Sequence, residues 1–160
     1  MYNPVFPWQP GFAPTWAGRP RRLVEKERIL WQWWRKAFGG RFEEYWFDVP
    51  LDGQPPREEI LPGLAKTLPP KYQRLWKSLT SKRADVIGRN GFVYQIIEIR
   101  SDIKPQTIGE LMVYNNLAIK EYPGLSFGRT IIIGDTVDDM LRATIEAEGM
   151  QLFTRNSATV

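Results

Sequence analysis

Apolar and polar residues alternate over residues 84–88 and again over residues 94–100. Successive side chains of a β-strand point to opposite faces, so Glu98 and Arg100 share one face while Ile97 and Ile99 share the other. Turn residues separate the two stretches, and a helical pattern follows from Pro105. This order predicts a β-hairpin and then an amphipathic helix, with a carboxylate and a cation side by side on the second strand.

Residues 21–38 show a different period. A stripe of residues, apolar except at one position, recurs every three or four positions, and Gly39 and Gly40 follow it. This spacing predicts a helix that buries one face. Glu27 interrupts the apolar stripe. A carboxylate on a buried face is either paired with a cation or placed at a functional site, and both alternatives remain open. The stripe consists of Leu23, Glu27, Leu30, Trp34 and Phe38.

The remaining patterns complete one domain. They predict strands over residues 42–49, 130–133 and 150–153, a proline-rich excursion over residues 50–70 and a short helix over residues 71–79. A further helix is expected after Thr136 or Asp135 as its cap, with Gly149 at its end. The expected core face of the helix that begins at Pro105 is Ile108, Leu111, Met112, Asn115 and Ile119.

These elements predict an α/β fold over residues 21–153. Its architecture is expected to be three-layer-like, with a mixed sheet flanked by helices. Residues 154–160 are expected to form a flexible tail.

Residues 1–20 have another character, because prolines and glycines alternate with aromatic residues. Proline fixes φ and removes backbone donors, so an extended N-terminal arm is expected rather than a helix. Exposed aromatic rings gain free energy by burial, so we expect the arm to lie on a surface. The domain is expected to be complete without it, which favours a neighbouring subunit as that surface. The residues expected to bind the partner are Tyr2, Phe6, Trp8, Phe12 and Trp16.

The amino-acid composition excludes several kinds of chemistry. The chain has no Cys and no His, which excludes disulfides, thiolate catalysis and histidine acid–base chemistry. No segment is typical of a signal peptide or a transmembrane helix, so a protein made and assembled in the cytoplasm, without a membrane partner, is expected.

Charge is distributed unevenly. Residues 1–84 hold 15 Lys and Arg against 8 Asp and Glu, whereas residues 85–160 hold 7 against 10. A basic half suits DNA or an acidic protein, although a solvated surface explains it equally well. The candidate DNA contacts are Lys71, Arg74, Lys77, Lys82 and Arg83.

The residues Arg83-Ala84-Asp85, the strand end Glu98-Ile99-Arg100 and the helix segment Ile108-Gly109-Glu110-Leu111 with Tyr114 resemble the core of the PD-(D/E)xK nuclease superfamily. The resemblance covers about residues 21–153 and implies a restriction-endonuclease-like core. It implies that Asp85, Glu98 and the carbonyl of Ile99 bind Mg²⁺ or Mn²⁺ for phosphodiester hydrolysis. Glu27 would be the acid that some members carry on the first helix, and Glu110 stands where many relatives have glutamine.

Arg100 departs from the family pattern, because it stands where the family has lysine. Arginine cannot be deprotonated in a protein and pairs readily with carboxylates, so Arg100 could neutralise Glu98 or Glu110 instead of serving a metal centre.

The chain also resembles small proteins of tailed bacteriophages that have a nuclease-like core, and this resemblance together with the patterns above implies three alternative functions. The first is a bacteriophage virion structural protein, a head–tail connector or tail component with an inactive nuclease-like core. Such a protein would need no cofactor, and its arm would fasten it to other virion subunits in a homo-oligomer or a hetero-assembly. The second is an active Mg²⁺-dependent nuclease. The third is a non-catalytic DNA-binding module.

Overall fold

The computed structural model describes residues 4–20, 22–51 and 82–156 of the chain. Within them, six strands form one sheet in the order β1–β2–β3–β5–β6, with β4 beside β3. The strands are β1 (Glu44–Pro50), β2 (Arg83–Asn90), β3 (Val93–Asp102), β4 (Ser126–Phe127), β5 (Ile131–Thr136) and β6 (Gln151–Thr154). The helices are α1 (Glu25–Phe38), the short 3₁₀ turn η1 (Gly39–Arg41), α4 (Pro105–Glu121) and α5 (Asp139–Ala147).

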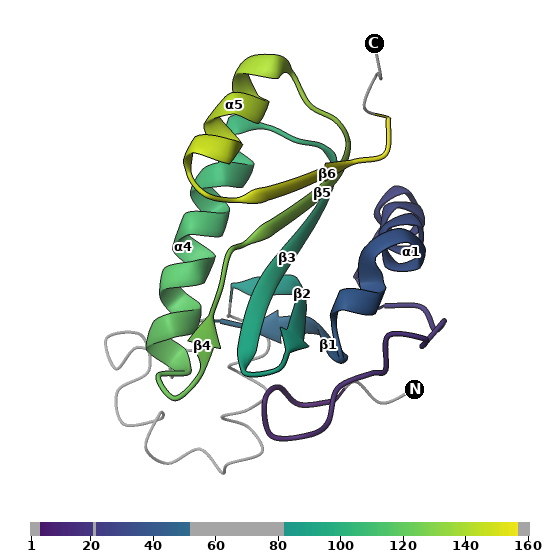
Figure 1. The fold of residues 1–160 in the computed structure, drawn as a ribbon, viewed down its shortest axis with the longest axis vertical. Helices are drawn as coiled ribbons and strands as arrows, with labels where there is room; N and C mark the ends of the chain where they lie inside the picture. Colours follow the sequence, from purple (N-terminus) through teal and green to yellow (C-terminus); the bar gives the residue numbers. More distant parts are fainter. Residues whose placement is uncertain (1–3, 21, 52–81, 157–160) are drawn as a thin grey trace, which may run out of the picture.

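The sheet lies between two helical layers. Helix α1 covers one face, and α4 and α5 cover the other (Figure 1). The α1 side is packed with aromatic and β-branched residues, among them Trp31, Trp34 and Phe47, and the α4 side includes Trp46 and Ile96. The predicted α/β fold with a mixed sheet flanked by helices is therefore confirmed.

The hairpin of β2 and β3 is the centre of the sheet. The two strands pair antiparallel from Asn90 with Val93 to Val86 with Ile97, and β3 then runs parallel to β5. The strands meet at a two-residue turn whose Gly91 has a φ of +60°, a conformation that glycine adopts without strain. The turn is shorter than the sequence predicted, because β2 continues to Asn90 and β3 already begins at Val93.

Helix α4 begins at Pro105 as predicted, but its buried face differs from the expected one. Ile108, Leu111 and Ala118 are buried, whereas Met112 and Ile119 are 47% and 49% exposed. The predicted core positions Met112 and Ile119 were therefore wrong. The 3.6-residue period fixes which residues share a stripe, but not how wide a stripe the sheet covers.

The cap of α5 also differs from the prediction. Asp138 occupies the N-cap, and its Oδ1 accepts a hydrogen bond from the Leu141 backbone at 2.8 Å. Asp135 and Thr136 lie instead at the end of β5, which runs beyond the predicted residues 130–133. Because β5 continues through Asp135 and Thr136, the cap is the next acidic residue, Asp138.

The described part of the arm packs on its own domain. Phe12 exchanges backbone hydrogen bonds with Tyr45 of β1, at 2.8 and 2.9 Å. Phe6 is 5% exposed, and its ring meets those of Trp46 and Tyr122 edge-on at 5.2 and 4.9 Å. The expectation that the domain is complete without the arm was therefore wrong, because Phe6 belongs to the hydrophobic core.

The predicted helix over residues 71–79, and most of the predicted excursion over residues 50–70, lie outside the described residues. No helix in the described ranges has the length and apolar character needed to cross a membrane.

Candidate functional site

The candidate site lies where β2 and β3 part. Beyond the Val86–Ile97 pair, β2 continues along β1 and β3 continues along β5. Two carboxylates bridge the parting strands. Asp85 Oδ2 accepts a hydrogen bond from the Ile99 backbone at 3.0 Å, and Glu98 Oε1 lies 3.4 Å from the Asp85 backbone nitrogen that donates to it. These side chains thus satisfy backbone groups that a continuous ladder would have paired.

Arg100 closes the cluster from β3. Its Nη1 donates to Asp85 Oδ2 at 3.3 Å and to the carbonyl of Ile99 at 3.2 Å, and it lies 3.1 Å from Glu98 Oε2. On the outer side, its Nη2 lies 3.2 Å from Glu110 Oε2. One guanidinium therefore contacts three carboxylates from two strands and a helix.

Burial and neighbouring charges shift the pKa values of Glu98 and Arg100. The side chain of Glu98 is 1% exposed, whereas those of Asp85 and Arg100 are 21% and 30% exposed. Burial raises the pKa of Glu98 well above its usual value, and the charge of Asp85 raises it further, while Arg100 opposes both. The carboxylates of Glu98 and Asp85 outweigh the effect of burial on Arg100 and raise its pKa, so the guanidinium stays charged.

Three further candidates surround the cluster. Glu27 of α1 accepts a hydrogen bond from the Val24 backbone at 3.2 Å, which explains why the helix begins at Glu25. Burial raises the pKa of Glu27, and the charge of Asp85 adds to the effect. Burial also raises the pKa of Tyr114 on α4, with contributions from Glu98 and Glu110. All six predicted site residues therefore share one electrostatic environment.

The arrangement can be compared with the needs of a divalent cation. Asp85, Glu98 and the Ile99 carbonyl offer the oxygen ligands that Mg²⁺ or Mn²⁺ prefers, and they converge on one point. Arg100 Nη1 lies at that point. Within the described residues, no group of three or more acidic side chains is arranged to hold a metal ion. With Arg100 in this position, the residues do not fit a bound cation.

Only two of the five predicted DNA contacts, Lys82 and Arg83, lie within the described residues. Lys71, Arg74 and Lys77 lie outside the described residues, and Lys82 is exposed. Arg83 is engaged within the domain, because its Nε lies 2.6 Å from Asp48 Oδ1 and its Nη2 donates to the Asp48 carbonyl. Its charge is therefore partly neutralised before any phosphate approaches.

Sequence reasoning missed the partners that β1 supplies. Asp48 binds both Arg22 and Arg83, and Glu44 binds Arg89 and accepts from the Gly11 backbone at 2.6 Å. Glu44 thereby ties the arm to the sheet. Acidic residues within a predicted strand were the available signal, but their partners lie 26 to 45 residues away along the chain.

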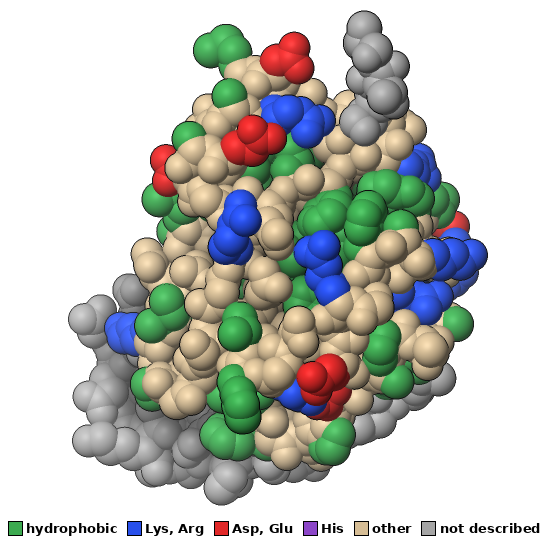
Figure 2. All heavy atoms as spheres, in the orientation of Figure 1, with side chains coloured by type: hydrophobic (Ala, Val, Ile, Leu, Met, Phe, Trp, Pro, Cys, Tyr) green, Lys and Arg blue, Asp and Glu red, His purple; other side chains and the backbone are tan. Residues whose placement is uncertain are grey.

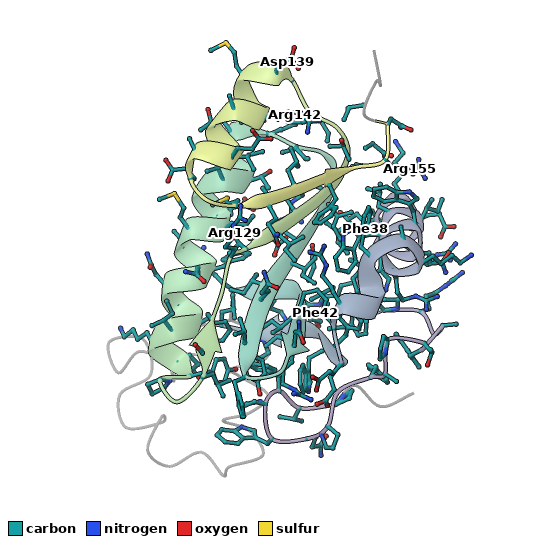
Figure 3. The ribbon with its side chains drawn as sticks, in the orientation of Figure 1. Phe38, Phe42, Arg129, Asp139, Arg142 and Arg155 are labelled. Atoms are coloured by element: carbon teal, nitrogen blue, oxygen red, sulfur yellow. The ribbon has the colours of Figure 1, made fainter. Side chains whose placement is uncertain are left out.

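A second surface lies between the edge strand β6 and α1, where Figure 2 shows hydrophobic side chains gathered among Lys and Arg. Phe38 of α1 and Phe153 of β6 have ring centroids 4.7 Å apart, and Arg41 lies over the Phe153 ring. Arg129, Arg142 and Arg155 lie along the β5 and β6 end of the sheet (Figure 3), and each binds a neighbouring carbonyl, hydroxyl or carboxylate. These arginines fasten the sheet edge and its flanking loops.

No family model matches the chain, and no curated protein or solved structure matches it at a significant level. Its function must therefore be argued from the geometry.

Proposed function

We propose that the chain is a non-catalytic structural protein whose nuclease-like core holds an internal ion-pair cluster in place of a metal centre. The observation that carries the proposal is the position of Arg100. Its Nη1 lies 3.1–3.3 Å from the three oxygens that would ligate a catalytic cation.

The position of Arg100 matters because of what phosphodiester hydrolysis requires. Phosphodiester hydrolysis at such a site depends on a metal that lowers the pKa of a bound water and offsets charge on the phosphoryl oxygens. A guanidinium has no open coordination position and cannot be deprotonated, so it can neither activate water as a metal does nor act as a base.

The order of elements supports a nuclease-like core. Helix α1 precedes three antiparallel strands, α4 follows, and β5 then lies parallel to β3. The acidic residues lie on the central hairpin of this arrangement. This is the succession that the resemblance of residues 21–153 to the PD-(D/E)xK superfamily implies.

The structural role rests on the arm. Phe6, Phe12 and Trp16 pack against the chain's own rings, but Trp8 is 80% exposed. Exposed indoles are frequent anchors at protein interfaces. In this proposal Trp8 contacts a neighbouring copy or another subunit of a bacteriophage virion, as a head–tail connector or tail component would require.

Incubation with single- and double-stranded DNA and Mg²⁺ or Mn²⁺ tests the absence of catalysis, with Asp85→Ala as the matched variant. We expect neither protein to cleave. Cleavage by the wild type that Asp85→Ala abolishes would overturn the proposal.

A second candidate, a metal-dependent nuclease, is favoured by one observation. Acidic residues from β2, β3 and α4 meet beside Tyr114, and those of β2 and α4, Asp85 and Glu110, are partly exposed to solvent. This candidate requires Arg100 to leave its position when a cation binds, and the same assay distinguishes the two functions.

A further inference from the structure

We propose that the outer face of α4 binds a second copy of this chain, and that the two α4 helices pack antiparallel about a two-fold axis. This face includes no residue of the arm. The inference therefore goes beyond the contact proposed for Trp8 and does not depend on it.

Helix α4 is apolar on two sides. Ile108 and Leu111 are buried on the side that packs on the sheet. On the other side Met112 is 47% exposed, Val113 45% and Ile119 49%. A helix that is apolar all round is usually covered on both sides. Because α4 forms the left side of the described structure (Figure 1), its outer face is placed to meet a partner.

The spacing of the outer residues is that of a helix pair. They recur at intervals of three, four and three positions, as the residues along the seam between two packed helices do. A single asparagine in such a seam is tolerated and fixes the register of the pair. The α4 seam is formed by Gly109, Met112, Asn116 and Ile119, with Val113 and Lys120 beside it, and all six residues are exposed.

The seam is complementary to itself when the two helices run antiparallel. With the axis at the level of Tyr114, Gly109 faces Ile119 of the second copy and Met112 faces Asn116 of the second copy. A Cβ at Gly109 would meet nothing within 4 Å, and glycine destabilises a helix relative to alanine. The described part of the domain gives no reason for this glycine, whereas space for an isoleucine of the second copy does.

Charge also favours a second copy in this orientation. Lys120 is the charged residue of the seam, and the antiparallel register places it beside Gln106 of the second copy, so that no like charges meet. A parallel pair would place Lys120 beside Lys120. The antiparallel order also brings the positive end of each helix dipole close to the negative end of the other. Val113 lies nearest the axis on this flank and faces Val113 of the second copy.

The size of the contact sets its strength. A helix of 17 residues is about 25 Å long, so one helix pair buries less than the roughly 800 Å² per partner of a standard interface. We therefore expect a reversible dimer with a dissociation constant of about 1–100 μM.

Sedimentation velocity of the full-length protein over a concentration series tests the proposal. The wild type should shift from monomer to dimer. Val113→Glu and Val113→Lys should each weaken the dimer by about tenfold or more, because like charges would face each other across the axis. An equal mixture of the two variants should regain the dimer, because the carboxylate of one copy then faces the ammonium group of the other.

Three further variants serve as controls. Ile29→Glu should leave the dimer unchanged, because Ile29 is 40% exposed on α1, which covers the opposite face of the sheet. Trp8→Ala should also keep the α4 dimer, even if it loses contacts of the arm. Ile119→Gln is measured in case the charged variants fold poorly, and it should weaken the dimer because Ile119 faces Gly109 of the second copy.

Four results would overturn the proposal. They are a wild type that stays monomeric up to about 1 mM, a dimer that survives both charged variants or Ile119→Gln, a mixture of the charged variants that stays monomeric, and loss of the dimer in Trp8→Ala. The last result would assign the self-contact to the arm and support the proposed function. DNA cleavage by the wild type would overturn the proposed function alone.

Discussion

The Ile99 backbone N–H donates to Asp85 Oδ2 at 3.0 Å, at the point where β2 and β3 stop pairing. The carboxylate thus replaces a strand carbonyl as the acceptor of a backbone donor. The same oxygen also accepts from Arg100. Asp85 therefore has a structural task that does not depend on any metal or substrate.

Asp85→Ala should consequently lower the free energy of unfolding by about 2 kcal/mol, because it leaves the backbone donor of Ile99 without its acceptor and Arg100 without one of its partners. Asp85→Asn keeps a side-chain carbonyl and should cost less. Urea unfolding measures both variants, with an unchanged m-value as the sign that only stability has altered. Equal stability of Asp85→Ala and wild type would contradict a structural role.

Phe6→Ala should lower stability by about 3–5 kcal/mol, since Phe6 is buried against aromatic rings of β1 and the α4 side. Trp8→Ala is the matched control, because Trp8 belongs to the same arm but is 80% exposed. It should change stability by less than about 0.5 kcal/mol. A similar loss from both substitutions, measured by urea unfolding, would show that Phe6 has no special place in the core.

Trp8→Ala should instead weaken self-association or binding to a virion partner, because loss of a buried indole at an interface typically costs about 2 kcal/mol or more. Light scattering across a concentration series measures self-association. A pull-down with the candidate subunit measures hetero-assembly. Unchanged association in both measurements would remove Trp8 from the proposed interface.

Gly134→Ala should destabilise the site end of the sheet. A Cβ at Gly134 would lie 2.4 Å from Ile103 Cδ1 and 2.9 Å from the Arg100 carbonyl, so the backbone of β3 must shift. A cost of about 1–3 kcal/mol is typical of such overpacking. Gly109→Ala on α4, where a Cβ meets nothing within 4 Å, should instead stabilise by about 0.5–1 kcal/mol. Urea unfolding of the pair should therefore give shifts of opposite sign.

Tyr122 gives a prediction at high pH. Its hydroxyl donates to the Pro50 carbonyl at 2.9 Å, and burial raises the pKa of Tyr122 to about 12. The folded state holds the proton after the unfolded chain has lost it, so the stabilising contribution of Tyr122 is present below pH 10 and falls as the pH rises from 10 to 12.

The cost of Tyr122→Phe should therefore be largest below pH 10 and shrink above it. Comparison of the variant with the wild type at each pH cancels the titration of other groups. A cost that stays constant from pH 9 to 12, in urea unfolding, would contradict the raised pKa.

The sequence predicted the hairpin and the convergence of Asp85, Glu98 and Arg100, because strand alternation and the following helix are local properties. It left open whether Arg100 pairs with Glu98 or Glu110. The structure shows contacts with both, and with Asp85 as well. The burial of Phe6 and the exposure of Met112 escaped prediction because both depend on elements far away along the chain.

The carboxylates that close the gap between β2 and β3 also bear on how such motifs are interpreted. Because the backbone needs acceptors at this place, a loss of Asp85 or Glu98 would be opposed by folding alone, even in a protein that performs no reaction. An acidic pair at the end of a hairpin can thus outlast an activity or precede one. The residue beside the pair, here Arg100, tells more about chemistry than the acids themselves.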